Sequence, residues 1–95
     1  MAAYLIAQIE VTDPQAYEAY KSQVPALIER YGGEYLVRGG ALEVLEGDWA
    51  MPRTIILRFP SMEAARAWYT AADYQPVKAL RRQASIGNVV LVDGM

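Results

Sequence analysis

The segment RGGALEVLEGDWAMPR, residues 38–53, concentrates residue types that could hold an acidic ligand. Arg38 precedes Gly39 and Gly40, so its guanidinium could grip a carboxylate or an enolate through two hydrogen bonds while the glycines admit the ligand close to the backbone. Arg53 closes the segment and supplies a second cation. The structural alternative is that each arginine forms a salt bridge with a glutamate of the same segment and that the two glycines mark a β-bulge.

Glu46 is the candidate general base of this segment. A carboxylate can take that role when apolar walls, here Trp49, disfavour its charged form; otherwise it is a solvated turn residue or a partner of Arg53. Eight positions separate Arg38 from Glu46, and on a regular strand this even spacing would place both side chains on one face. A bulge between them would break that parity, so the sequence leaves open whether they share a cleft.

A second group of candidates consists of Trp68, Tyr69, Tyr74 and Arg81. Trp68 and Tyr69 are consecutive on a predicted helix, so their side chains diverge by about 100°, and one could pack in the core while the other lines a cleft. Tyr69 could donate a hydrogen bond to a developing oxyanion, with Arg81 stabilising the charge; the alternative is packing in the core or at a dimer interface. Aromatic residues suit a planar organic ligand, and we predict a cleft lined by some of Arg38, Trp49, Trp68, Tyr69 and Tyr74.

The composition excludes several chemistries. Cysteine and histidine are absent, which rules out disulfides, a thiolate nucleophile, a histidine base and a Cys/His zinc site. No acidic cluster has ligand spacing, so we predict no metal and no cofactor. The net charge is −2 without a basic block, so nucleic acid and membrane are not expected partners. The N-terminus lacks the features of a signal peptide, and the expected location is the cytoplasm.

Hydrophobic periodicity predicts the elements that would position these residues in a single domain spanning residues 1–95. Residues 3–11 alternate as in a strand. Asp13, followed by proline, suits the start of a helix that ends at Gly32-Gly33. Pro25 lies inside this helix and should bend it, freeing carbonyl groups near residues 21 and 22.

The rest of the chain predicts three more strands and further helices. Strands are expected at 34–38 resuming over 41–46 after a bulge at Gly39-Gly40, at 53–59 and at 86–92, and helices at 62–72, capped by Ser61, and at 77–84. The order β-α-β-β-α-β with right-handed crossovers predicts a ferredoxin-like α+β fold, a four-stranded antiparallel sheet with helices on one face. The other face would expose apolar residues such as Ile6 and Ile56, which predicts a homodimer with its sheets face to face.

Three segments, YGGEYLVRGGALEVLEGDW, RFPSMEAARAWY and YQPVKALR, resemble the domain-of-unknown-function 1330 family of the dimeric α/β-barrel superfamily. The resemblance covers nearly the whole chain and implies the ferredoxin-like fold and a homodimer. Arg58 and Ala71 depart from the family pattern, which often has an acid and a serine there. The residues that match it are Arg38, Gly39, Gly40, Glu46, Gly47, Trp49, Arg53, Phe59, Trp68, Tyr69, Tyr74 and Arg81.

The resemblance implies little chemistry, because this family has no established activity, although its superfamily includes cofactor-independent monooxygenases, isomerases, dehydratases and haem-handling enzymes. The sequence therefore supports two main hypotheses. One is an enzyme that needs no cofactor and catalyses proton transfer or oxygenation of a small acidic organic compound, with arginines holding the anion and Glu46 moving protons. The other is a non-catalytic ligand-binding or structural dimer module.

Overall fold

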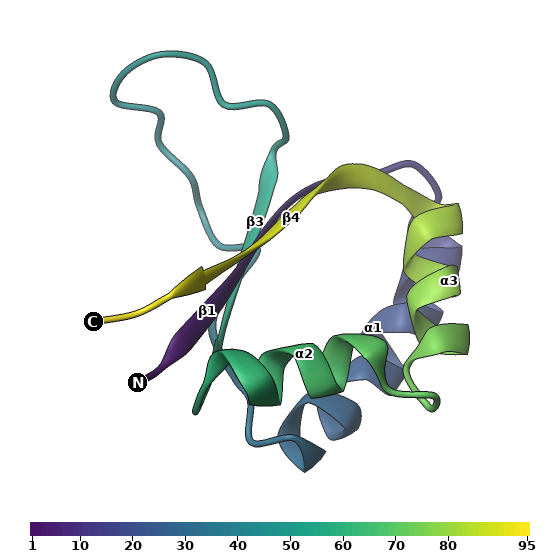
Figure 1. Cartoon of the computed structure of the whole chain (residues 1–95). Coiled ribbons are helices and arrows are strands. Elements are labelled where there is room, and N and C mark those ends of the chain that lie inside the picture. Colours follow the sequence, from purple (N-terminus) through teal and green to yellow (C-terminus); the bar gives the residue numbers. More distant parts are fainter.

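The computed structural model describes residues 1–95, and its elements follow the predicted order. They are β1 (Ala3–Val11), α1 (Pro14–Arg30), β2 (Glu34–Arg38), β3 (Arg53–Phe59), α2 (Met62–Thr70), α3 (Gln75–Ala84) and β4 (Ser85–Asp93). The strands form one four-stranded antiparallel sheet in the order β2-β3-β1-β4, and the helices lie to one side of it (Figure 1). This is the predicted ferredoxin-like fold.

The central strand β1 carries the predicted alternation. Leu5, Ala7 and Ile9 are buried on the side that faces the helices. Ile6, between them in sequence, points to the other side, where it lies opposite Ile56 of β3 and Val90 of β4. We call the first side of the sheet the helix-facing side and the second the open side. Each strand therefore contributes to two surfaces with different surroundings.

The helix starts follow local sequence signals. The Asp13 side chain accepts a hydrogen bond from the Ala16 backbone N–H at 3.2 Å, and Ser61 Oγ accepts one from the Ala64 N–H at 3.0 Å. Each satisfies a donor that the first helical turn would otherwise leave free. After α1, Gly32 adopts a positive φ of 82°, a conformation that glycine reaches without steric cost. The predicted caps are thereby confirmed.

Pro25 lies within α1, and the helix continues through it. Proline has no N–H to donate to the carbonyl one turn earlier, which is that of Lys21. Arg38 supplies the missing donor, because its Nη2 hydrogen-bonds to the Lys21 carbonyl oxygen at 3.1 Å. The predicted free carbonyl thus fixes an arginine of β2 against α1.

The predicted strand over residues 41–46 is wrong. β2 ends at Arg38, and the segment between Gly40 and Pro52 forms a loop that projects away from the sheet and the helices (Figure 1). Pairing with β3 stops where the Gly39 N–H donates to the Thr54 carbonyl at 2.8 Å. Beyond that point no neighbouring strand offers hydrogen-bond partners to an extended backbone, so the strand ends. Leu45 in this loop is 85% exposed, so the apolar residues of the loop have no core to face.

The predicted bulge is also displaced. The register between β2 and β3 shifts between Tyr35 and Val37, not at Gly39-Gly40. Gly39 instead adopts a positive φ of 69°, and a side chain at this position would collide with the Arg53 guanidinium. Its role is therefore to let Arg53 lie against the backbone. Separately, no helix combines the length and the apolar character needed to cross a bilayer.

Candidate ligand-binding cavity

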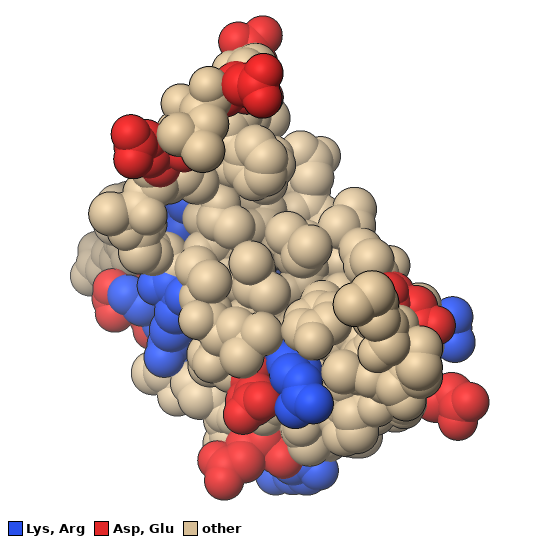
Figure 2. Space-filling model, turned by 90° about the vertical axis from the view of Figure 1, so that its left-hand side faces the viewer, with Lys and Arg blue, Asp and Glu red and all other residues tan.

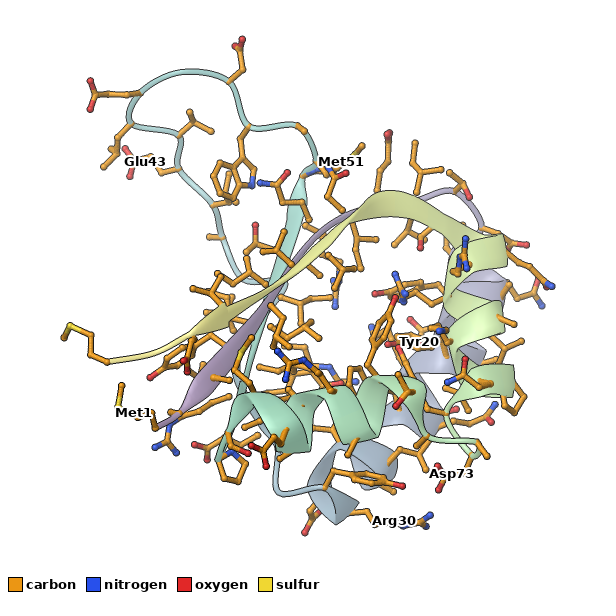
Figure 3. All side chains as sticks on the ribbon, in the orientation of Figure 1. Met1, Tyr20, Arg30, Glu43, Met51 and Asp73 are labelled. Atoms are coloured by element: carbon orange, nitrogen blue, oxygen red, sulfur yellow. The ribbon has the colours of Figure 1, made fainter.

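A cavity lies between the helix-facing side of the sheet and the helices, where Tyr20 points inward (Figure 3). Its free volume is about 30 Å³, room for about two water molecules at ~10–15 Å³ each. A larger ligand enters only if long side chains at the rim move. The floor is apolar, with Leu5, Ala7 and Ile55 among the lining residues, and the polar lining residues are Tyr17, Tyr20, Lys21, Tyr35, Arg38, Arg53, Tyr69, Tyr74 and Arg81.

The charges around the cavity have one sign. Lys21, Arg38, Arg53 and Arg81 line it, and no aspartate or glutamate does. Lys21 pairs with Glu18 at 3.3 Å, whereas none of the three arginines forms a salt bridge. The structure therefore does not realise the alternative in which Arg38 and Arg53 pair with glutamates of their own segment. The cavity instead holds an excess of positive charge in largely apolar surroundings.

Arg38 and Arg53 form one end of the cavity. The Arg38 guanidinium lies 4.6 Å from the Tyr35 ring centroid and that of Arg53 lies 5.8 Å from the Tyr17 ring centroid. Both arrangements are cation–π contacts, which hold a guanidinium without neutralising it. Arg53 Nε is buried and has no hydrogen-bond partner. Buried donors are nearly always satisfied, so this Nε, which lies beside Gly39, is an unusual unpaired donor at the edge of the cavity.

Tyr20, Tyr74 and Arg81 form the other polar group. The Tyr20 and Tyr74 hydroxyl oxygens are 3.1 Å apart and both side chains are buried. Burial, reinforced by Tyr74, raises the pKa of Tyr20; burial also raises the pKa of Tyr74, although Tyr20 and Arg81 oppose it. Both hydroxyls therefore stay protonated at neutral pH. Only one of their two protons is used between them, so the second can be donated to a ligand.

Trp68 and Tyr69 both line the cavity but differ in burial. Trp68 is 2% exposed and packs against Phe59 and Tyr74, with ring centroids 5.6 and 4.2 Å away. Its Nε1 is buried without a partner, which adds a second unused donor beside the cavity. Tyr69 is half-buried and its ring is covered by the Lys78 ammonium at 4.4 Å. Trp68 thus belongs to both core and cavity, and Tyr69 forms a wall between the cavity and the surface.

Four predicted site residues do not line the cavity: Gly39, which lies against Arg53, and three that lie elsewhere. Glu46 is exposed in the projecting loop, so the structure separates it from Arg38 and offers it no base role in this cavity. Trp49 donates from Nε1 to Thr54 Oγ1 at 3.2 Å and does not line the cavity. Gly40 has open space around it. One physical reason explains all three positions. Strand pairing ends at Gly39, and the chain beyond it leaves the sheet.

The sequence placed Tyr17 and Tyr20 on the apolar face of their helix without a site role. Tyr20 meets Tyr74 from 54 positions away, and no local pattern encodes that contact. Tyr35 could have been placed from strand pairing. It lies opposite Leu57 and therefore on the helix-facing side of the sheet. Lys21 could have been identified from the sequence, because it lies one turn before Pro25, where a free carbonyl was predicted.

The fold and the cavity define a ferredoxin-like α+β protein with a small, positively charged cavity between its sheet and its helices. The chain belongs to the family described as domain of unknown function (DUF1330), whose model matches residues 2–95. No curated protein matches it. The comparisons thus confirm the resemblance seen in the sequence.

Solved structures show the same fold. A protein of unknown function from Rhodopseudomonas palustris has a TM-score of 0.78 at 18% identity, covering 99% of this chain and 82% of that one. SnoaB, a cofactor-independent oxygenase from Streptomyces nogalater, has a TM-score of 0.66 at 16% identity, covering 99% and 93%. Rv0793 from Mycobacterium tuberculosis has a TM-score of 0.58 at 17% identity, covering 100% and 96%. At these identities the likeness concerns the fold.

Proposed function

We propose that the cavity binds a small planar organic anion, such as the carboxylate, phenolate or enolate of an aromatic compound. The observation that carries this proposal is the set of three arginines, Arg38, Arg53 and Arg81, that line an apolar cavity without a carboxylate partner. Arg38 is exposed at the rim, whereas Arg53 and Arg81 are partly buried, and a partly buried charge without a counterion is costly. A bound anion offsets that cost, and the five lining tyrosines supply flat surfaces for its ring.

We also propose that the bound anion reacts without metal or cofactor. Arg81 and the Tyr20–Tyr74 hydroxyl pair would stabilise an electron-rich oxyanion, which is the form of an aromatic compound that can react with O₂ directly. In such an oxygenation a substrate methylene loses two hydrogens, one oxygen atom becomes its carbonyl and the other leaves as water. The fold shared with SnoaB, a cofactor-independent oxygenase, is compatible with this chemistry. Simple proton transfer through the same hydroxyls is the second reaction to test.

Calorimetric titration tests the binding proposal. We expect 2-naphthoate to bind and the uncharged 2-naphthamide, which has nearly the same shape, to bind at least about tenfold more weakly, a difference of ~1.4 kcal/mol. Arg53→Met should reduce this preference. Arg82→Met is the matched control, because Arg82 is exposed and lies outside the cavity. Equal binding of the two compounds would contradict an anion site.

An oxygen electrode separates the enzyme from the non-catalytic module. The protein would be mixed with naphthalene-1,3-diol, an electron-rich compound that ionises readily. Oxygen consumption above the rate without protein, reduced by Arg81→Met and retained by Arg82→Met, would support the oxygenase. Binding of the diol without any oxygen uptake would favour the non-catalytic alternative.

We further propose that a second copy of the chain covers the open side of the sheet. Val90 and Val92 of β4 are 51% and 46% exposed there, next to Ile6 and Tyr4 of β1. Figure 2 shows a broad uncharged area, with most charged side chains toward its edges. An apolar sheet surface of this kind favours association. Pairing two sheets would leave each helix-facing cavity intact.

A further inference from the structure

The cavity has two polar ends on opposite sides of β1. Arg38 and Arg53 lie on the paired strands β2 and β3, whereas Arg81 lies on α3, which leads directly into β4. Ile9 of β1 pairs with Arg53 on one side and with Gly87 on the other. Strands are spaced by about 4.8 Å, so roughly 10 Å separates the two flanking backbones. A single flat molecule can reach from one end to the other.

The first end suits a full negative charge. Here the cavity opens into a polar recess lined by Glu18, Lys21, Ser22, Arg38 and Arg53, which gives access to water. Arg38 donates a hydrogen bond to the Lys21 carbonyl, and Arg53 packs against the Gly39 backbone and near the Tyr17 ring, so both guanidinium groups are restricted in position. Two guanidinium groups in restricted positions, one of them with an unpaired buried Nε, match the two oxygens of a carboxylate.

The second end suits an oxygen with little charge. The Tyr20 and Tyr74 hydroxyls are buried and share one hydrogen bond, which leaves one proton to donate. Arg81 stands beside this end and also borders a recess toward the start of β4. A phenolic or enolic oxygen could accept from a tyrosine and become more acidic beside the arginine. The lining between the ends is apolar and includes Leu5, Ala7 and Leu57.

We propose that the ligand is a planar aromatic hydroxy acid that lies across β1, with its carboxylate at Arg38 and Arg53 and its hydroxyl oxygen at Tyr20, Tyr74 and Arg81. This inference rests on the proposed function and specifies its ligand class. It assigns anchoring to the two arginines of the β2–β3 end. It assigns the reacting side of the molecule to the tyrosine end.

Three naphthalenes test the arrangement by calorimetry: 6-hydroxy-2-naphthoate, 2-naphthoate and 2-naphthol. The compound with both groups should bind at least about tenfold more tightly than either single-group compound. Arg53→Met should weaken binding of both carboxylates about tenfold and leave 2-naphthol unchanged. Tyr74→Phe should weaken the two hydroxyl compounds and leave 2-naphthoate unchanged.

Gly39→Ala provides a second variant, in which Arg53 is retained but displaced. It should reproduce the effect of Arg53→Met on the carboxylates. Gly47→Ala is the matched control, because Gly47 has a similar positive φ of 72° but no neighbour within 4 Å. We expect Gly47→Ala to introduce similar backbone strain without any loss of carboxylate binding.

The outcomes distinguish the two proposals. If none of the three compounds binds, the proposed anion-binding function itself fails. If they bind but the hydroxy acid has no advantage, or if Arg53→Met weakens 2-naphthol as much as the carboxylates, the two-ended arrangement is overturned while the anion site stands.

Discussion

The two sides of the sheet differ in how completely this chain covers them. On the helix-facing side, Ile9 and Phe59 are 1% and 0% exposed, and the helices enclose the cavity. On the open side, Val90 in the same sheet is 51% exposed. The strands and their alternation are shared, so the difference comes from what packs against them. The helix-facing side is covered within one chain, and the open side is the one that the proposed dimer would cover.

The charges are divided in a similar way. Cationic side chains line the cavity, whereas Glu43, Glu46 and Asp48 lie exposed on the projecting loop, where Figure 2 shows acidic groups at its tip. The acids of this loop therefore do not neutralise the arginines of the cavity. The separation leaves the positive charge of the cavity uncompensated.

The largest difference between the two sides should appear in stability. Trp68→Ala removes a buried indole from the helix-facing core and should lower the free energy of unfolding by about 3–5 kcal/mol. Trp49→Ala removes an indole that is 45% exposed and should cost no more than about 1 kcal/mol. Urea denaturation followed by circular dichroism measures both. Similar losses for the two substitutions would contradict the contrast.

Alkaline pH should destabilise the helix-facing side specifically. Burial raises the pKa of Tyr20, Tyr35 and Tyr74 in the folded chain, while in the unfolded chain these groups ionise near about pH 10. Above that pH the folded state binds more protons than the unfolded state, so the free energy of unfolding falls as pH rises. Each fully protected tyrosine contributes up to about 1.4 kcal/mol per pH unit in that range.

Denaturation midpoints between pH 8 and 11 check this effect. The double variant Tyr20→Phe, Tyr74→Phe should lose less stability over the same interval, because two of the protected hydroxyls are gone. Tyr4→Phe, on the open side, should follow the wild-type profile. An unchanged slope in the double variant would show that the buried pair is not responsible.

The open side should respond to added charge by losing its partner. Val90→Lys places an ammonium on this exposed apolar surface and should raise the dimer dissociation constant by at least about tenfold, ~1.4 kcal/mol. Gln83→Lys, on an exposed position of α3, adds the same charge elsewhere and should leave association unchanged. Sedimentation velocity over a concentration series measures this. A wild-type chain that sediments as a monomer at micromolar concentration would refute the dimer.

The smallest effect is expected at the periphery of the helix layer. Arg30 of α1 pairs with Asp73 in the turn before α3, and the two lie together at the rim of the molecule (Figure 3). Exposed ion pairs contribute little, so Arg30→Ala should cost about 0–1 kcal/mol. That loss should shrink in high salt, which thermal unfolding at two ionic strengths can show.

Local signals account for what the sequence predicted well. The alternation of residues 3–11, the Asp13 and Ser61 caps and the glycine stop at Gly32 each depend on a few adjacent residues, and the structure confirms them. The loop at residues 41–46 is also rich in apolar residues but has no strand beside it. Pairing is a contact between distant segments, and a pattern along one segment cannot supply it.

The site, like the fold, could be predicted from the sequence only in part. The residue types and their resemblance to the family pointed to Arg38, Arg53 and Arg81, and all three line one cavity. Their lack of carboxylate partners was not visible in the sequence, because it depends on where the loop carries Glu46. The Tyr20–Tyr74 pair was missed for the same reason, since it joins α1 to the N-terminal end of α3 across the fold.

The most direct test of the anion site is a crystal structure of the protein grown with 2-naphthoate. We expect the ring between the sheet and the helices, with the carboxylate oxygens within hydrogen-bond distance of the Arg38 and Arg53 guanidinium groups. Density for the ligand on the open side of the sheet or along the projecting loop, with the cavity unchanged, would contradict the account.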